Sequence, residues 1–244
     1  MRLAMLVEYD GTDYFGWQVQ PDQPTIQESL ERALRTILAH PVRVEAAGRT
    51  DAGVHALGQV AAFSTERTPN PGTLQRGVNA LAGPGIVVRE LFEVDSGFDP
   101  RRDARRRTYE YRIDDRPWPS PLRSRYTWHV RGPLDVEAMA LAAASLVGDH
   151  DFRSFQAAGC DAETPLRTVF ASEVERRDGE IVYRIAATAF LRHMVRNIVG
   201  TLIEVGRHER TPGEFLELLA SHDRRLAGPT APPRGLCLIQ VEYA

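Results

Sequence analysis

The sequence predicts an α+β protein made of two ferredoxin-like, RRM-like halves that form a continuous, mostly antiparallel sheet with helices on one face. Three observations lead to this expectation. The first hundred residues read as strand, helix, strand, strand, helix, strand, and the remainder repeats that rhythm loosely. A stretch rich in turn residues and charge, DSGFDPRRDARR, separates the two. We therefore expect a first half over residues 1–100 and a second over residues 101–244.

Each element of the first half has its own signal. An apolar run at residues 2–9 ends at the turn Asp-Gly-Thr and indicates a buried strand. Thr25 suits a helix N-cap with Glu28 three residues later, and apolar residues then recur at helical spacing. The other elements expected in this half are short strands at 42–48 and 60–65, a helix at 73–81 and a returning strand at 86–94.

The second half contains longer patterns. Two long strands over residues 166–190 are joined at Asp178-Gly179, a dipeptide typical of a hairpin turn. A strong apolar stripe predicts a helix over residues 190–206. The remaining expected elements are strands at 107–113, 126–130 and 236–243 and helices at 135–148 and 211–221.

Composition excludes several classes of protein. No apolar run approaches the roughly 18 residues that span a bilayer, and the N-terminus lacks the pattern of a signal peptide, so we expect a cytoplasmic protein without membrane contact. Cys160 and Cys237 are too few for a disulfide framework, and the seven histidines have no metal-ligand spacing. The sequence therefore predicts no metal and no cofactor.

Every one of the 30 basic residues is arginine. A chain without lysine has neither a phosphate-binding loop of the GxxxxGK type nor a Schiff-base lysine. Ten arginines against four acids between Arg101 and Arg131 give a local excess of +6, which leaves −9 for the rest of the chain. This asymmetry favours an anionic partner, although a solvated charged face would show the same pattern.

The stretch GRTDAGVHA, residues 48–56, places Asp51 in a predicted turn between two glycines. A lone loop aspartate most often satisfies its own backbone in an Asx turn. Here Arg49 and His55 lie within a few residues, and the glycines would let a planar substrate approach the backbone. Asp51 is thus a candidate for chemistry as well as for a turn.

The same stretch resembles the signature of the TruA family of tRNA pseudouridine synthases. The resemblance extends along nearly the whole chain through YDGTDYFGWQVQP, TIQESLERAL, RTYEYRI, HDFRSF, FLRHMVRNIVG and APPRGLCL. The sequence departs from the family pattern at AGPG after Leu81 and in the arginine-rich segment before Tyr109. Both departures concern local loop geometry.

The resemblance implies a cofactor-free isomerase that converts uridine to pseudouridine at nucleotides 38, 39 and/or 40 of the tRNA anticodon stem-loop. It assigns Asp51 as the essential carboxylate, Arg196 as its cationic partner, and Tyr109 as the residue that stacks on the uracil and takes part in proton removal. By analogy with the family, Leu236 would form an apolar wall of the uracil pocket. Arg49, next to the turn of Asp51, is a candidate to hold the displaced strand or to fill the space that the base vacates. The resemblance also implies a homodimer whose subunits together hold one tRNA.

Two other functions fit parts of the pattern. A non-catalytic RNA-binding module would use ferredoxin-like halves with exposed aromatic residues and would not need Asp51. A glycoside hydrolase would pair Asp51 with Glu8 or Asp10 and would release free uracil. Trp17 and His55 are expected to be structural residues.

Overall fold

The computed structural model describes residues 1–160 and 162–243. The chain forms two compact units, the first made of Met1–Arg105 with Cys237–Ala244 and the second of Arg106–Leu236. Both contain helices and a mostly antiparallel sheet, so the predicted α+β class is confirmed. None of the helices in the described residues is long and apolar enough to cross a membrane.

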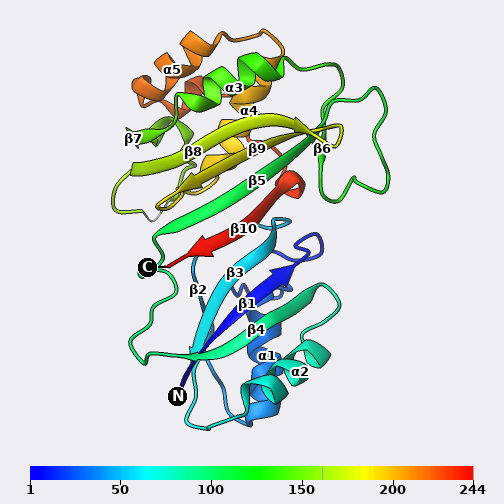
Figure 1. Ribbon diagram of the computed structural model, residues 1–244, viewed down its shortest axis with the longest axis vertical. Helices are drawn as coiled ribbons and strands as arrows, with labels where there is room; N and C mark the ends of the chain where they lie inside the picture. Colours follow the sequence, from blue (N-terminus) through cyan, green and yellow to red (C-terminus); the bar gives the residue numbers. More distant parts are fainter. Residues whose placement is uncertain (161, 244) are drawn as a thin grey trace. The chain divides into compact units, whose positions relative to one another are not determined.

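The sheet of the first unit has the strand order β4, β1, β3 and β10, with the short β2 paired to β3 (Figure 1). Its strands are β1 (Arg2–Tyr9), β2 (Glu45–Ala46), β3 (His55–Ser64), β4 (Ile86–Val94) and β10 (Leu236–Glu242). Strand β1 is central and antiparallel to both neighbours, with Leu3 opposite Phe63 on β3. Alternate residues of β1, beginning at Leu3, are almost completely buried and form one face of the core.

The strand β10 follows the second unit in sequence but joins the sheet of the first. It runs parallel to β3, with Cys237 opposite His55 and Leu238 opposite Ala56. The sequence order placed this strand with the second half. Its pairing to β3 is a contact between residues about 180 positions apart, which local patterns cannot indicate.

Two helices complete the first unit. Helix α1 (Ile26–Leu38) begins after Thr25, whose side chain accepts a hydrogen bond from the Glu28 amide, as the sequence predicted. Helix α2 (Pro71–Leu81) begins two residues earlier than expected, because Asn70 is its N-cap and a proline occupies its first position. The two helices pack closely at Gly77, where an added Cβ would lie 2.9 Å from the Ile37 side chain.

The sheet of the second unit has the order β5, β9, β8 and β7, and the short β6 pairs with β5. Its strands are β5 (Arg106–Asp114), β6 (Trp128–His129), β7 (Gly148–Asp151), β8 (Leu166–Arg177) and β9 (Glu180–Ala187). The hairpin between β8 and β9 turns at Asp178 and Gly179, which have φ values of 51° and 78°, as expected for a tight two-residue turn. The predicted strand at 126–130 is reduced to two residues, and β7 was not predicted.

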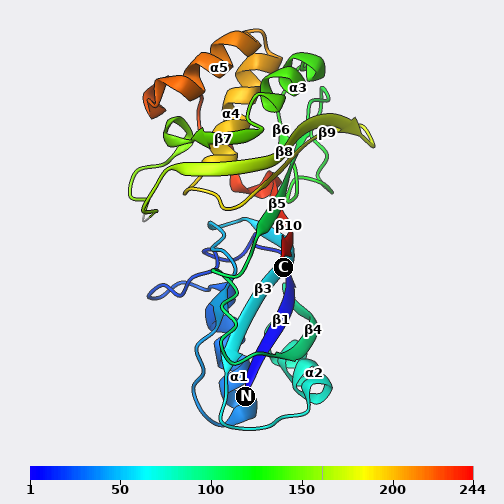
Figure 2. The same ribbon diagram turned by 60° about the vertical axis from the view of Figure 1, so that its left-hand side comes forward.

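Three helices of the second unit gather on one side of β8 and β9 (Figure 2). They are α3 (Val136–Ala144), α4 (Met194–Gly206) and α5 (Pro212–Ser221). The sequence placed the start of α4 at residue 190, but it begins at Met194, because His193 adopts a left-handed conformation with φ of 59°. Helix α5 begins with a capping box between Thr211 and Glu214.

Candidate active site

Asp51 occupies a tight turn just before β3. The Val54 amide donates to the Asp51 carbonyl at 3.1 Å, and Gly53 within this turn has φ of 77°. A left-handed conformation at that place favours glycine, which explains the glycine two residues after Asp51. The Asp51 side chain is half-buried, whereas Ala52 beside it is exposed.

A second loop, residues 10–17, is joined to this turn by backbone hydrogen bonds. The Trp17 amide donates to the Thr50 carbonyl at 3.0 Å, and the Gly53 amide donates to the Tyr14 carbonyl at 3.2 Å. Gly16 has φ of 86°, and a Cβ there would lie 2.7 Å from the Thr50 carbonyl oxygen. The two backbones therefore approach so closely that only glycine fits at this position.

Buried side chains support the turn from the sheet. The hydroxyls of Tyr9 and Thr50 are 2.8 Å apart, and Gln59 donates to the Gly48 carbonyl at 2.8 Å. Burial raises the pKa of Tyr9, so its hydroxyl stays neutral and serves as a hydrogen-bonding group. Trp17 packs beside the Tyr9 ring at a centroid distance of 6.1 Å. These contacts fix the residues on both sides of Asp51.

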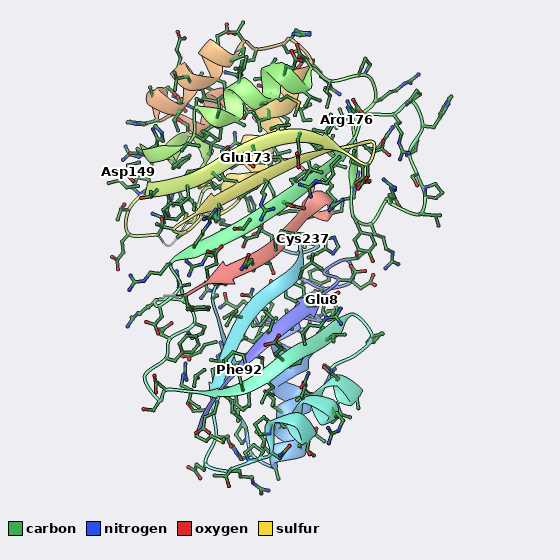
Figure 3. The ribbon with its side chains drawn as sticks, in the orientation of Figure 1. Glu8, Phe92, Asp149, Glu173, Arg176 and Cys237 are labelled. Carbon is green, nitrogen blue, oxygen red and sulfur yellow. The ribbon has the colours of Figure 1, made fainter. Side chains whose placement is uncertain are left out.

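The other two carboxylates of the glycoside-hydrolase alternative have structural partners. Glu8 on β1 accepts a hydrogen bond from Arg89 at 2.6 Å, and Figure 3 marks Glu8 on its strand. Asp10 accepts hydrogen bonds from the Thr12 amide and hydroxyl at 2.9 and 2.6 Å, and it lies 3.1 Å from a ring nitrogen of His55. Glu8 and Asp10 are therefore both engaged in structural hydrogen bonds, whereas an inverting hydrolase needs a second carboxylate that activates water.

Arg49 and His55 flank Asp51 in sequence but lie in different surroundings. Arg49 is exposed at the surface. His55 is buried, and the Gly11 amide contacts its Nδ1 at 3.1 Å. Burial of His55 and of Trp17 agrees with the structural roles expected for both, whereas Arg49 is accessible to a ligand.

Tyr109 lies on β5 in the second unit and is only 8% exposed. Its ring meets Phe190 edge to face at a centroid distance of 5.1 Å and an interplanar angle of 86°. Phe190 belongs to the segment just before α4, so this contact packs β5 against that segment. Thr108 and Glu110 point to the other face of β5, because successive side chains of a strand alternate between its two faces.

Arg196 lies in the first turn of α4 and is half-buried. Its Nε donates to the Ala231 carbonyl at 2.7 Å, and the Ala231 amide donates back to the Arg196 carbonyl at 3.0 Å. The helix predicted over residues 190–206 would place Arg192 one helical turn before Arg196. That placement is wrong, because Arg192 precedes the first residue of α4 and therefore does not share a helix face with Arg196.

Leu236 follows a short 3-10 turn, Pro233–Gly235, that packs on Tyr111. The Tyr111 hydroxyl donates to the Pro232 carbonyl at 2.7 Å, and a Cβ on Gly235 would lie 2.5 Å from the Tyr111 ring. Burial raises the pKa of Tyr111, and Arg196 is near enough to oppose that shift. Leu236 itself is 6% exposed.

The second unit thus brings three candidate residues onto adjoining segments. Arg196 contacts the segment that carries Leu236, and Tyr111 on the face of Tyr109 supports the same segment. The sequence analysis missed Tyr111 and the Tyr9–Thr50 pair. The alternation Tyr-Glu-Tyr at residues 109–111 could have indicated Tyr111, whereas the Tyr9–Thr50 contact depends on the tertiary fold.

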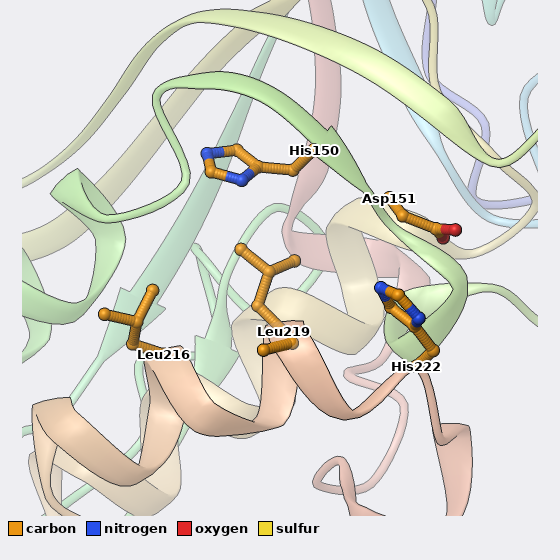
Figure 4. A pocket seen from close by; sticks show the side chains of 6 residues that line it. His150, Asp151, Leu216, Leu219 and His222 are labelled. Atoms are coloured by element: carbon orange, nitrogen blue, oxygen red, sulfur yellow. The ribbon is translucent and has the colours of Figure 1, made fainter.

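A small hollow lies apart from these residues. It has a volume of about 150 Å³ and lies between β7 and α5, where His150 and His222 flank Leu219 (Figure 4). None of the candidate residues lines it. Over residues 1–160 and 162–243, no group of three or more His, Cys, Asp or Glu side chains is arranged to hold a metal ion.

Comparison with known families identifies the chain. The family model described as tRNA pseudouridine synthase matches residues 5–99 and 142–244. The chain belongs to the tRNA pseudouridine synthase family. The matched ranges of this family include Asp51, Arg196 and Leu236, while Tyr109 lies between them.

Curated members of the tRNA pseudouridine synthase family match over the full chain. A protein of Myxococcus xanthus named tRNA pseudouridine synthase A is 49% identical over 243 residues, covering 99% of this chain and 92% of its own. Proteins of the same name are 47% identical in Geobacter sulfurreducens and 44% identical in Geotalea uraniireducens, each over 99% of both chains. These relatives make the chain a member of an isomerase family.

Proposed function

We propose that this protein isomerises uridine to pseudouridine in the anticodon stem-loop of tRNA, with Asp51 as the essential carboxylate. In this reaction the N1 glycosidic bond breaks, the base rotates, and C5 bonds to C1′, so no redox partner is needed. The observation that carries the proposal is the turn of Asp51, because its backbone and neighbours are fixed while its side chain stays partly accessible. An essential group benefits from such positioning.

Arg196 is the proposed partner of Asp51. The two residues belong to different units, and each is anchored within its own: Asp51 by the turn before β3, and Arg196 by Ala231. The first turn of a helix carries partial positive charge, which adds to that of the guanidinium and favours a carboxylate as neighbour. Such a pair would place a guanidinium beside the carboxylate in a pocket that also holds an uncharged base.

Tyr109 is proposed to stack on the uracil and to take part in proton removal at C5, and Leu236 to form an apolar wall of the pocket. Stacking on an aromatic ring contributes about 1 to 3 kcal/mol per base. Arg49 is proposed to hold the displaced strand, in keeping with its exposure beside the turn. Removing a base from the stack costs a few kcal/mol, which contacts of this kind offset.

The decisive experiment uses purified protein and tRNA that lacks modifications. The wild-type protein is expected to form pseudouridine at nucleotides 38, 39 and/or 40, and Asp51→Asn is expected to form none while binding tRNA normally. Asp13→Asn is the matched control, because this aspartate lies in the neighbouring loop and has no assigned role. Native activity in Asp51→Asn would remove the proposed chemistry.

The pairing of Asp51 with Arg196 has its own test. Arg196→Gln and Asp51→Asn are each expected to abolish turnover, and the double variant is expected to be no worse than either, because the groups act as a unit. Arg192→Gln, which precedes the helix, serves as the control. An Arg196→Gln protein with native kcat would contradict the pairing.

The finer aspects of the proposal concern assembly and location. If the protein is a homodimer that holds one tRNA, light scattering should give twice the chain mass and titration should give one tRNA per two chains. An active monomer would contradict the proposed homodimer. A cytoplasmic location agrees with action on tRNA. A non-catalytic RNA-binding module would bind tRNA without altering it, and a glycoside hydrolase would release uracil, so analysis of the reaction products separates all three.

A further inference from the structure

The loop between β5 and β6, residues 116–127, has an unusual surface. We call it the Trp118 loop. Trp118 is 79% exposed and Leu122 is 91% exposed, the two highest values among the exposed large apolar residues of the described chain. Its backbone departs from the sheet at Asp114 and returns at β6 (Figure 1). Large exposed apolar side chains that gather on one loop mark a candidate binding surface.

The loop is held in shape at its start. The Arg116 guanidinium donates to both carboxylate oxygens of Asp114 at 2.7 Å, and Arg176 on β8 donates to both oxygens of Asp115 at 2.9 and 2.7 Å. These hydrogen bonds hold the pKa values of both carboxyl groups below the ordinary range. The first residues of the loop are therefore tied to two strands of the sheet.

The middle and the end of the loop are held as well. Arg123 forms an ion pair with the buried Glu180 at 2.8 Å, and its carbonyl accepts from the Thr127 hydroxyl at 3.0 Å. Arg234 donates to the Thr127 carbonyl at 3.2 Å. Prolines at 117, 119 and 121 restrict the backbone on either side of Trp118. The loop thus presents its apolar side chains at small entropic cost.

The charge of the loop indicates the chemistry of its ligand. Residues 116–127 contain three arginines and no acidic residue. Arg116 and Arg123 pair with Asp114 and Glu180, and Arg125 is exposed at the surface. The acids at the start of the loop, Asp114 and Asp115, are almost completely buried and paired. Exposed aromatic rings among arginines are the combination that binds unpaired nucleotides, since the ring stacks on a base and the guanidinium groups contact phosphates.

A second copy of the chain is a poorer occupant. A two-fold contact centred on this loop would bring the same surface of both copies together and would set its arginines against one another. A polyanion meets no such repulsion. The charge complementarity therefore selects nucleic acid over self-association.

We propose that the Trp118 loop is a second RNA-binding element, in which Trp118 stacks on an unpaired base of the tRNA other than the reacting uridine. This proposal rests on the proposed function for the choice of tRNA as the RNA. The loop lies outside the ranges matched by the family model, so membership of the family does not by itself assign it a role. Its contribution is to affinity and orientation, and it takes no part in the chemical step.

The test measures binding and turnover separately. Trp118→Ala is expected to weaken binding of unmodified tRNA about tenfold and to raise KM in parallel, with kcat unchanged. Trp118→Phe retains a ring and is expected to stay within about threefold of the wild type. Leu141→Ala is the matched control, because Leu141 on α3 is also strongly exposed and its loss should leave binding unchanged.

Tryptophan fluorescence gives an independent reading. Trp17 is buried and Trp118 is the most exposed of the three tryptophans, so bound tRNA should quench the wild-type emission much more than that of Trp118→Phe. Equal quenching together with native affinity in Trp118→Ala would overturn the proposal. A change of molar mass in Trp118→Ala with unchanged tRNA affinity would also overturn it, in favour of a contact between copies.

These outcomes are distinct from failure of the proposed function. If the wild-type protein formed no pseudouridine but bound tRNA with quenching from Trp118, the isomerase proposal would fall and the binding role of the loop would stand. If pseudouridine formed normally in both the wild type and Trp118→Ala with equal KM, the binding role of the loop would fall and the isomerase proposal would stand.

Discussion

Two loops of this protein are fixed by opposite means. The turn of Asp51 is held through its backbone, which lies against a second loop so closely that Gly16 leaves no room for a side chain. The Trp118 loop is held through its side chains, by ion pairs of Arg116, Asp115 and Arg123 with partners at its base. The first arrangement sets one functional group within narrow limits. The second leaves a broad surface open to a ligand.

This comparison teaches where each loop should be sensitive to change. Two backbones in contact cannot move apart without displacing the residues they carry. A substitution that adds atoms at the Asp51 turn should therefore lower kcat sharply. Exposed or half-exposed ion pairs contribute less, because water and salt screen them. Changes at the base of the Trp118 loop should therefore have smaller effects, and those effects should fall on binding.

The largest effect is expected for Gly16→Ala. The added Cβ would lie 2.7 Å from the Thr50 carbonyl oxygen and would also require an alanine with φ of 86°. The Asp51 turn must then shift, and a displacement of about 1 Å can reduce kcat about a hundredfold. Affinity for tRNA should be nearly unchanged. Single-turnover kinetics and a binding titration measure both quantities.

Gly72→Ala provides the control for Gly16→Ala. Gly72 lies in α2, and the atoms nearest to an added Cβ are 3.6 Å away. This variant should keep native kinetics and be slightly more stable, because alanine favours the helix. If Gly16→Ala turned over tRNA as fast as Gly72→Ala, the close approach of the two loops would not determine the position of Asp51.

An intermediate effect is expected for Thr50→Val. The substitution leaves the buried Tyr9 hydroxyl with only a long contact to Gln59 at 3.4 Å, and the free energy of unfolding should fall by about 1 to 3 kcal/mol. Urea denaturation measures the loss. The double variant with Tyr9→Phe should lose less than the sum of the two single changes, because it removes both hydroxyls. Strict additivity would show that the pair is not coupled.

The smallest effect is expected for Asp115→Asn at the base of the Trp118 loop. Hydrogen bonds from Arg176 lower the pKa of Asp115 in the folded state, so its charge stabilises the fold above the unfolded pKa of about 3.9, and the contribution is lost as the pH falls toward the folded pKa. The variant should lose about 1 kcal/mol at neutral pH, and KM for tRNA should rise about threefold with kcat unchanged.

The pH dependence of unfolding is the check on this prediction. The difference in stability between the wild type and Asp115→Asn should be full at neutral pH and should shrink below about pH 4. Asp95→Asn is the control, because no ion pair is described for the Asp95 side chain. Its stability difference from the wild type should not change with pH in this range. A difference that persisted at low pH would mean that the hydrogen bonds of Arg176 do not depend on the charge of Asp115.

The sequence predicted those features of the fold that local interactions determine. The cap at Thr25, the turn at Asp178-Gly179 and the strand at 107–113 follow from neighbours in the chain, and the structure contains all three. The predicted starts of α2 and α4 differ from the observed ones, because helix ends depend on single residues such as the cap Asn70 and the left-handed His193. The residue pattern also identified the family, which the comparison with relatives confirmed.

Only the tertiary structure decided the remaining features. Strand β10 joins β3 across most of the chain length, Gly16 and Tyr14 clamp a turn that is more than thirty residues away, and Tyr111 supports the segment of Leu236. The sequence by itself determined the family and most of the local elements, and it supplied the candidate residues whose roles are proposed above. The physical reason for the division is that capping, periodicity and turn geometry act over a few residues, whereas close packing and hydrogen bonds between distant segments exist only once the chain has folded.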